Sequence, residues 1–173
     1  MKGTIHICLG KMIKQNYGPT KWEECLTSMG LSANHDFSVY DDVDESLTME
    51  FIVNTTKVLG VPLSQIFDEF GEYWSCSYAP EVYKAFYLSV SSTRQMIEKL
   101  DNIHVVMTKA MDSARPPRFE YKWLEGNKLE LTYNSQRQLI DLMISLIKGL
   151  DKKFQCNTNI TKMGPSKMIL EFN

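Results

Sequence analysis

MIEKLDNIHVVMTKAM, residues 96–111, has the pattern of an amphipathic helix, and the rest of the chain is best understood from it. At 3.6 residues per turn, one stripe of this helix is apolar and carries a histidine: Ile97, Leu100, His104, Met107 and Met111. An imidazole on an apolar face needs partners for its ring nitrogens, because an unsatisfied buried polar group costs about 1–3 kcal/mol. Two roles for His104 follow, a hydrogen-bonded core residue or a metal ligand.

The composition is that of an ordinary globular protein. Of the 173 residues, 43% are hydrophobic and 23% are charged, which suits one compact domain with its own core. The 19 basic and 21 acidic residues are dispersed, so the sequence offers no basic surface for nucleic acid or an anionic membrane. The N-terminal sequence does not resemble a signal peptide, and no apolar stretch reaches the roughly 18 residues of a spanning helix. We expect a cytoplasmic protein.

The cysteines show neither a Cys-x-x-C pair nor the spacing of a zinc site: Cys8, Cys25, Cys76 and Cys156. We expect reduced thiols in or near the core. Cys76 lies in a polar run, residues 74–78, that suggests a loop, but no neighbouring His or acid would activate it as a nucleophile. The 10 methionines and the many aromatic residues indicate an adaptable interior that would suit a large flat cofactor, although such interiors also occur without one.

The first half of the chain predicts helices. An apolar stripe beginning at Ile5 ends at Gly18-Pro19, and the capping-box spacing of Thr20 and Glu23 begins a second helix that ends at Gly30. We expect further helices over residues 47–59, 62–70 and 80–87, the first ending at Gly60 and the second at Gly71. The acidic run at residues 41–45 is either solvated or favours a helix N-terminus.

The second half changes to strands. Arg115-Pro-Pro-Arg118 predicts a rigid, extended connector. Alternating runs at residues 119–124 and 128–133 indicate a hairpin, and runs at residues 154–161 and 167–172 indicate a second hairpin after a helix over residues 139–150. Helices followed by a four-stranded antiparallel sheet with one inserted helix predict an α+β fold.

The end of the second predicted strand carries several hydrogen-bond donors. If the backbone stays extended, the alternate residues Tyr133, Ser135 and Arg137 share one face. A guanidinium that can bind a carboxylate with two N–H groups, beside two hydroxyls, suits the anionic groups of a ligand. A structural alternative stays open at this point. Ser135 would then cap the next helix, Arg137 would pair with the acidic run, and Tyr133 would pack in the core.

Taken together, these residues resemble a known family. The N-terminal sequence Met1-Lys-Gly-Thr-Ile5, the helical His104 followed by Pro116-Pro-Arg118, and the Tyr-x-Ser-x-Arg triplet are similar to the haem nitric oxide/oxygen binding (H-NOX) family. That family includes the haem domain of soluble guanylate cyclase. The resemblance covers essentially the whole chain, and it implies a single H-NOX domain at residues 1–173. Residues 1–62 would form its distal helical part, and residues 63–173 its proximal part with the sheet.

The resemblance also implies roles for these residues. His104 would be the proximal axial ligand of the iron of haem b (iron protoporphyrin IX). Tyr133, Ser135 and Arg137 would hold the haem propionates, and Pro117 would contact the porphyrin. The chemistry agrees, because neutral imidazole is a good iron ligand and propionates need charge-assisted hydrogen bonds.

The distal pocket that the resemblance implies contains Ile5, Leu9, Trp74 and Leu142. Oxygen on ferrous iron is held best by a hydrogen-bond donor, whereas nitric oxide and carbon monoxide need less help. Oxygen-binding members of the family have a tyrosine five residues beyond the arginine of the triplet, and this chain has Leu142 there. Trp74 could donate its indole N–H, but we interpret it as a space-filling wall of an apolar pocket.

We therefore expect a bacterial, stand-alone and non-enzymatic sensor of nitric oxide, which would also bind carbon monoxide. Nitric oxide would weaken the bond between the iron and His104, and the freed helix would present a changed surface. The resemblance implies a histidine kinase or a cyclic-di-GMP enzyme as the partner in trans. Two alternatives stay open, an oxygen-binding haem sensor and a haem-free interaction module. An enzyme is least expected, because His6 and His35 lack a paired acid and nucleophile.

Overall fold

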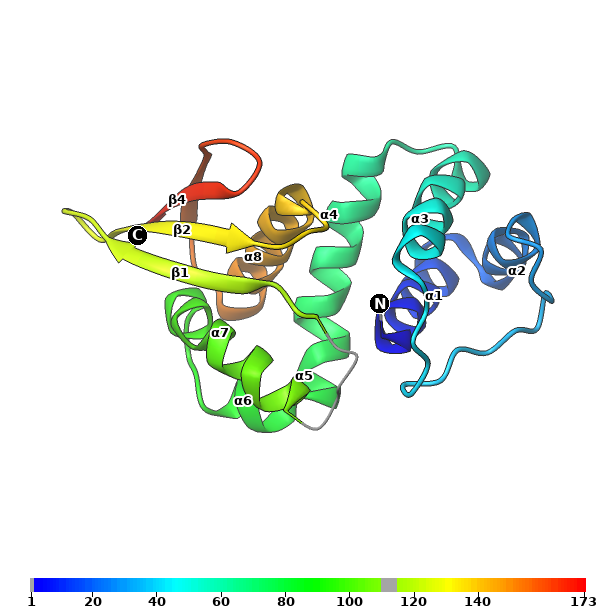
Figure 1. Ribbon diagram of the computed structural model, residues 1–173, viewed down its shortest axis with the longest axis horizontal. Coiled ribbons are helices and arrows are strands. Elements are labelled where there is room, and N and C mark those ends of the chain that lie inside the picture. The colour runs from blue at the N-terminus through cyan, green and yellow to red at the C-terminus, as the bar shows by residue number, and fades with distance from the viewer. Residues whose placement is uncertain (1, 110–114) are drawn as a thin grey trace. The chain divides into compact units, whose positions relative to one another are not determined.

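The computed structural model describes residues 2–109 and 115–173 of the chain. The chain divides into two compact units, residues 1–70 and 71–173 (Figure 1). Among the helices of the described residues, none combines the length and the hydropathy that crossing a bilayer requires. The assignment of residues 1–173 to a single domain stays a prediction.

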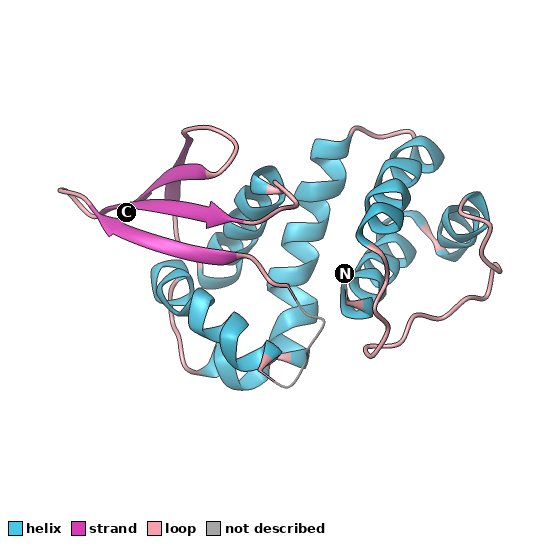
Figure 2. Ribbon diagram, in the orientation of Figure 1, coloured by secondary structure: helices cyan, strands magenta, loops and turns pink. Residues whose placement is uncertain are grey.

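The first unit is built from helices and loops (Figure 2). Its helices are α1 (Gly3–Tyr17), α2 (Pro19–Ser28), α3 (Glu45–Leu59) and the first part of α4 (Leu63–Tyr73). The apolar stripes of these helices face inward, and Met12, Ile13 and Leu26 are completely buried. The helical character predicted for this part of the chain is confirmed.

Three of the predicted helix ends in this unit are confirmed in detail. The side chain of Asp44, in the acidic run, accepts hydrogen bonds from the first turn of α3, which stabilises a helix N-terminus. At the other end of α3, Gly60 adopts a left-handed φ of 69°. Gly30 has a φ of 73° after α2, where the N–H of Leu31 donates to the carbonyl oxygen of Leu26 at 3.1 Å.

The capping box predicted at Thr20 is wrong. The α2 helix begins one residue earlier, at Pro19, and the residue before it is Gly18, which has no side chain to cap the helix. The fixed φ of proline suits the first helical position, and its missing N–H is one that the helix would leave unpaired in any case. Pro19 therefore begins the helix, and Thr20 lies inside its first turn.

The second unit contains the predicted four-stranded sheet, so the α+β fold predicted for the chain is confirmed. After α4 it contains η1 (Trp74–Tyr78), α5 (Ala79–Val82), α6 (Lys84–Leu88), α7 (Thr93–Thr108), β1 (Arg118–Trp123), β2 (Lys128–Asn134), α8 (Ile140–Phe154), β3 (Thr158–Lys162) and β4 (Lys167–Phe172). Within the described residues, four strands form one antiparallel sheet in the order β1-β2-β4-β3. Leu129, Leu131, Met168 and Leu170 of the two central strands are completely buried. The α7 helix packs against β1 (Figure 1), and α8 packs against η1.

The α4 helix does not end at Gly71, so that prediction is wrong. It continues to Tyr73 and passes directly into η1, a short π-helical segment. Gly71 is buried, and a Cβ atom added to it would lie 2.3 Å from the carbonyl oxygen of Ser145 on α8. Glycine is needed here because two helices approach each other closely, and not because a helix ends.

The loop predicted around Cys76 is likewise wrong, because residues 74–78 form η1. The thiol of Cys76 donates to the carbonyl oxygen of Gly149 on α8 at 3.5 Å, and burial raises its pKa. All four cysteines are free thiols, as expected.

Two element boundaries also differ from the prediction. The helix expected over residues 80–87 is divided at Tyr83, whose φ of −112° and ψ of 36° are not helical. The second hairpin begins at Thr158, because α8 extends to Phe154 and ends at Gln155, which has a φ of 54°. The ring of Phe154 stacks on that of Tyr87 at 6.1 Å between centroids. This contact explains why residue 154, which the sequence pattern assigned to a strand, is apolar at the end of a helix.

Candidate functional site

The α7 helix carries His104, and its early turns are firmly held. Its N-cap residue is Ser92, whose hydroxyl accepts a hydrogen bond from the N–H of Gln95 at 3.3 Å. Ile97 is completely buried, whereas Leu100, His104 and Met107 on the predicted stripe are half-buried. Met111, the last residue of that stripe, lies outside the described residues. The apolar stripe is therefore only partly covered by the protein around His104.

One ring nitrogen of His104 has a clear partner. Nδ1 lies 3.0 Å from the carbonyl oxygen of Pro117, in the connector between α7 and β1. Because a carbonyl oxygen can only accept, Nδ1 carries the proton and Nε2 carries the lone pair. Within residues 2–109 and 115–173, Nε2 has no hydrogen-bond partner. Burial lowers the pKa of His104, although the Pro117 carbonyl opposes that shift, so burial favours the neutral imidazole.

Asp101 and Arg118, to which the sequence analysis gave no role, lie beside this hydrogen bond. Arg118 donates from Nε and Nη2 to the two carboxylate oxygens of Asp101, each at 2.7 Å. The backbone N–H of Phe119 donates to the same carboxylate at 3.0 Å. The Arg118 guanidinium is the main reason that the pKa of Asp101 falls to about 2. The pair is separated by 17 residues in the sequence, so only the fold brings it together.

The backbone is not extended beyond Asn134, so the shared strand face that an extended backbone would give the triplet does not form. The β2 strand ends at Asn134, and residues 135–138 form a turn in which the N–H of Gln138 donates to the carbonyl oxygen of Ser135 at 3.3 Å. Gln138 has a left-handed φ of 52°. A strand pattern is a poor guide here because Ser135, Gln136 and Arg137 are polar residues that serve equally well in a turn.

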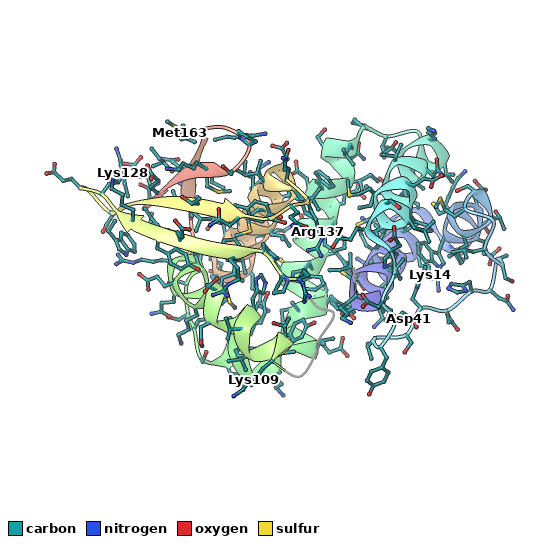
Figure 3. All side chains as sticks on the ribbon, viewed as in Figure 1. Lys14, Asp41, Lys109, Lys128, Arg137 and Met163 are labelled. Carbon is teal, nitrogen blue, oxygen red and sulfur yellow. The ribbon has the colours of Figure 1, made fainter. Side chains whose placement is uncertain are left out.

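The turn gives each member of the triplet a different setting. Tyr133 is buried, with its ring centroid 5.9 Å from that of Phe119. The Ser135 hydroxyl accepts a hydrogen bond from the N–H of Arg137 at 3.2 Å, and it does not cap α8, whose N-cap residue has no side-chain hydrogen bond. The Ser135 cap considered above is therefore wrong. Arg137, beyond the end of β2 (Figure 3), donates from Nη1 to the carbonyl oxygen of Arg115 at 2.9 Å.

The connector at residues 115–118 is where these groups meet. Its carbonyl oxygens accept from Arg137 and from His104, and its last residue, Arg118, binds Asp101. The Phe119 ring lies 5.5 Å from the His104 ring and 5.9 Å from the Tyr133 ring. The fold therefore brings the predicted axial ligand and the predicted propionate-binding residues to one region of the second unit.

The predicted distal-pocket residues are divided between the two units. Ile5 and Leu9 lie on α1 of the first unit, Leu9 being buried. Trp74 lies in η1 and Leu142 on α8 of the second unit, and both are half-buried. The Trp74 ring is 5.5 Å from that of Tyr78 between centroids. A pocket that all four residues line stays a prediction.

Comparison with known proteins identifies the family. A model of the haem-NO-binding family, HNOB, matches residues 2–162 of this chain. The chain belongs to the haem-NO-binding (H-NOX) family. Among curated proteins, the soluble guanylate cyclase gcy-37 of Caenorhabditis elegans is 24% identical over 157 residues, which cover 88% of this chain and 22% of gcy-37. The chain thus spans about a fifth of the length of this relative.

Solved H-NOX structures share the fold. One is an oxygen-binding H-NOX domain related to soluble guanylate cyclases, in its oxygen complex, with a TM-score of 0.88 and 22% identity. That likeness covers 100% of this chain and 95% of the other. A variant of the T. tengcongensis H-NOX protein gives a TM-score of 0.86 at 21% identity, covering 100% of this chain and 98% of the other. At these identities the likenesses establish the fold.

The donors of this chain fit the haem that the H-NOX family binds. Within the described residues, no group of three or more His, Cys, Asp or Glu side chains could hold a bare metal ion. Iron in a porphyrin needs only one or two axial ligands from the protein, and His104 offers one neutral imidazole with the lone pair on Nε2. The Pro117 carbonyl at Nδ1 is the type of partner that fixes the orientation of a ligating histidine.

Proposed function

We propose that this H-NOX chain is a haem-based sensor that binds nitric oxide, and carbon monoxide, with His104 as the proximal ligand of haem b. The hydrogen bond between Nδ1 of His104 and the Pro117 carbonyl carries this proposal. It fixes the tautomer whose lone pair is on Nε2, and burial favours the neutral ring that iron ligation requires.

The residues of the β2–α8 turn would hold the cofactor's acidic groups. When bound, haem supplies a ferrous iron that can take a diatomic gas, together with two propionates that need hydrogen-bond donors. Arg137 can bind a carboxylate through two N–H groups, and the hydroxyls of Ser135 and Tyr133 add neutral donors. Pro117, held by His104, would lie against the porphyrin.

The preference for nitric oxide rests on the predicted distal residues. Ile5, Leu9 and Leu142 have no side-chain donor, so they give no hydrogen bond to a gas that carries partial negative charge. Oxygen is the second candidate, because Trp74 carries an indole N–H and one of the matched structures is an oxygen-binding H-NOX domain. The two candidates differ in whether air changes the spectrum of the reduced protein.

Signalling would act through α7. If the bond between His104 and a bound haem iron were lost, the imidazole and the connector residues that hold it would be free to move, and the equilibrium would shift toward a second arrangement of α7. We propose that a histidine kinase or a cyclic-di-GMP enzyme reads this change in trans, and we expect no catalytic activity from residues 1–173. The partner rests on the family resemblance. A pull-down of each of these enzymes with the gas-bound and the gas-free protein would test it. We expect the two forms to retain one of the enzymes in different amounts.

Absorption spectra of the reduced protein test the proposed function. We expect five-coordinate ferrous haem before nitric oxide is added and loss of the proximal bond afterwards. His104→Ala should lose the axial nitrogen, whereas His35→Ala, a change at a half-buried loop position of the first unit, should behave as the wild type. An unchanged spectrum in His104→Ala would contradict the ligand assignment.

The same spectra recorded in air decide between the gases. Air should leave the reduced wild-type spectrum unchanged, and Leu142→Tyr should make it oxygen-sensitive by adding a donor. Oxygen sensitivity of the wild type that Trp74→Phe abolishes would favour the oxygen sensor instead.

A further inference from the structure

The ion pair between Asp101 and Arg118 is the most completely bonded one described in this chain. Arg118 binds both carboxylate oxygens, and Phe119 adds a third hydrogen bond from the backbone. The backbone N–H of Asp101 also donates to the hydroxyl of Tyr121 at 3.2 Å. Four hydrogen bonds, all involving Asp101, thus join the α7 helix to β1.

This joint shares its backbone with the His104 hydrogen bond. The Pro117 carbonyl that accepts from Nδ1 belongs to the same planar peptide unit as the N–H of Arg118. Asp101 lies three residues before His104, on the same face of α7. Fixing the Arg118 side chain on Asp101 therefore limits rotation of the peptide plane that carries the acceptor of the imidazole proton.

Ion pairs on a protein surface seldom restrict the backbone in this way. The Asp101 side chain is only 22% exposed, and the geometry is bidentate, which makes the pair more directional than a single contact between long side chains. Arg94, earlier on α7, offers a contrast. It binds Glu98 through Nε at 3.0 Å and lies 4.3 Å from the centroid of the Trp123 ring, but it does not touch the connector.

We propose that Asp101 and Arg118 are positioning residues that hold the Pro117 carbonyl against Nδ1 of His104. They thereby fix the imidazole tautomer and strengthen Nε2 as a ligand. Hydrogen bonds from the partners of metal-bound histidines typically change metal affinity by about 10–100-fold. The effect on tautomer is independent of haem, whereas the effect on iron affinity rests on the proposed function.

NMR of haem-free residues 1–173 labelled with ¹⁵N-histidine tests the tautomer. The wild type should show His104 protonated at Nδ1. Asp101→Asn and Arg118→Gln should each raise the population protonated at Nε2, and the double variant should do no more than either single one, because both changes break one joint. Arg118→Lys keeps the charge without the two-point contact. Its population protonated at Nε2 should lie between those of the wild type and Arg118→Gln.

Arg94→Gln is the matched control, because it removes another arginine contact between α7 and the sheet hairpin. It should leave the His104 tautomer as in the wild type. A wild-type tautomer in Arg118→Gln, or an equal shift in Arg94→Gln, would overturn the proposal. Arg118 is largely exposed, so its variants should fold even if Asp101→Asn does not.

The haem-loaded protein tests the consequence. Asp101→Asn and Arg118→Gln should lose haem at least about tenfold faster than the wild type and should lower the iron–histidine stretching frequency, and Arg94→Gln should do neither. If the wild type binds no haem, the proposed function fails while the tautomer measurement still decides this inference. Haem release at the wild-type rate in both variants would overturn the claim that this ion pair strengthens iron ligation by His104.

Discussion

His6 and His104 show how local surroundings decide what an imidazole does. Nδ1 of His104 is held by a carbonyl oxygen, and its Nε2 is left with a lone pair. His6 is buried on α1, with its ring stacked on Phe37 at 4.6 Å and the ring of Phe51 at 5.9 Å. Its Nδ1 has no hydrogen-bond partner within the described residues. His6 is therefore a core residue of the first unit.

His6 should make the stability of the protein depend on pH. Burial lowers the pKa of His6 to about 4, below the unfolded value of about 6.5. Between these two values the unfolded state binds more protons, so the free energy of unfolding should fall as pH falls from about 6.5 toward 4. We expect a loss of about 2 kcal/mol between pH 7 and pH 5 from this group.

Urea unfolding at pH 7 and pH 5, followed by circular dichroism, measures this loss. His6→Phe should reduce the pH dependence by that amount, because phenylalanine fits an aromatic cluster and does not titrate. His35→Phe serves as the control, since His35 is not buried as His6 is. Equal pH dependence in the wild type and His6→Phe would show that another group is responsible.

Among the elements, α4, η1 and α8 show what a sequence pattern leaves ambiguous. Gly71 has the same appearance in the sequence whether it ends a helix or allows two helices to touch. The fold decides, because a Cβ atom on Gly71 would meet the Ser145 backbone, and a Cβ atom on Gly149 would lie 2.2 Å from the carbonyl oxygen of Gly71. The close approach of two backbones is a property of the assembled helices.

Gly149→Ala should therefore destabilise the protein. Alanine favours a helix over glycine by about 1 kcal/mol, so local propensity alone would raise the free energy of unfolding. The clash is with backbone atoms, which cannot turn away as a flexible side chain can, and overpacking of this kind costs about 1–3 kcal/mol or more. We expect a net loss of roughly 1–2 kcal/mol in the free energy of unfolding.

Chemical denaturation of Gly149→Ala measures this change. Ser77→Ala, at an exposed position of η1, should leave the free energy of unfolding nearly unchanged. A Gly149→Ala variant more stable than the wild type would show that α4 and α8 can move apart without a cost in free energy.

The helices and strands themselves were largely predictable from the sequence. One face of each is buried, and the apolar residues of that face recur at the spacing of a helix or a strand. The hairpins at residues 118–134 and 158–172 are examples. The ion pair between Asp101 and Arg118 was not predictable. Both residues are charged, so they add nothing to an apolar pattern, and each is equally compatible with a solvent-exposed position. The turn at Ser135 was missed for the same reason, since polar residues are compatible with both a strand end and a turn.

At the scale of the whole molecule, the H-NOX assignment implies that folding and cofactor binding are linked. A ligand that binds only the folded state, at a hundred times its dissociation constant, adds about 2.7 kcal/mol to the free energy of unfolding. We expect such an increase when haem is added to the haem-free protein, and a smaller one in His104→Ala.

Thermal unfolding with and without haem measures this linkage. His35→Ala should show the wild-type increase. Equal melting temperatures with and without haem in the wild type would instead favour a haem-free interaction module.

The most direct test of the central claim is resonance Raman spectroscopy of the ferrous, haem-loaded protein labelled with ¹⁵N-histidine. We predict an iron–histidine stretching band that shifts with the label, is absent in His104→Gly, and returns when free imidazole is added to that variant. A band that survives in His104→Gly, or that is missing from the wild type, would contradict the assignment of His104 as the iron ligand.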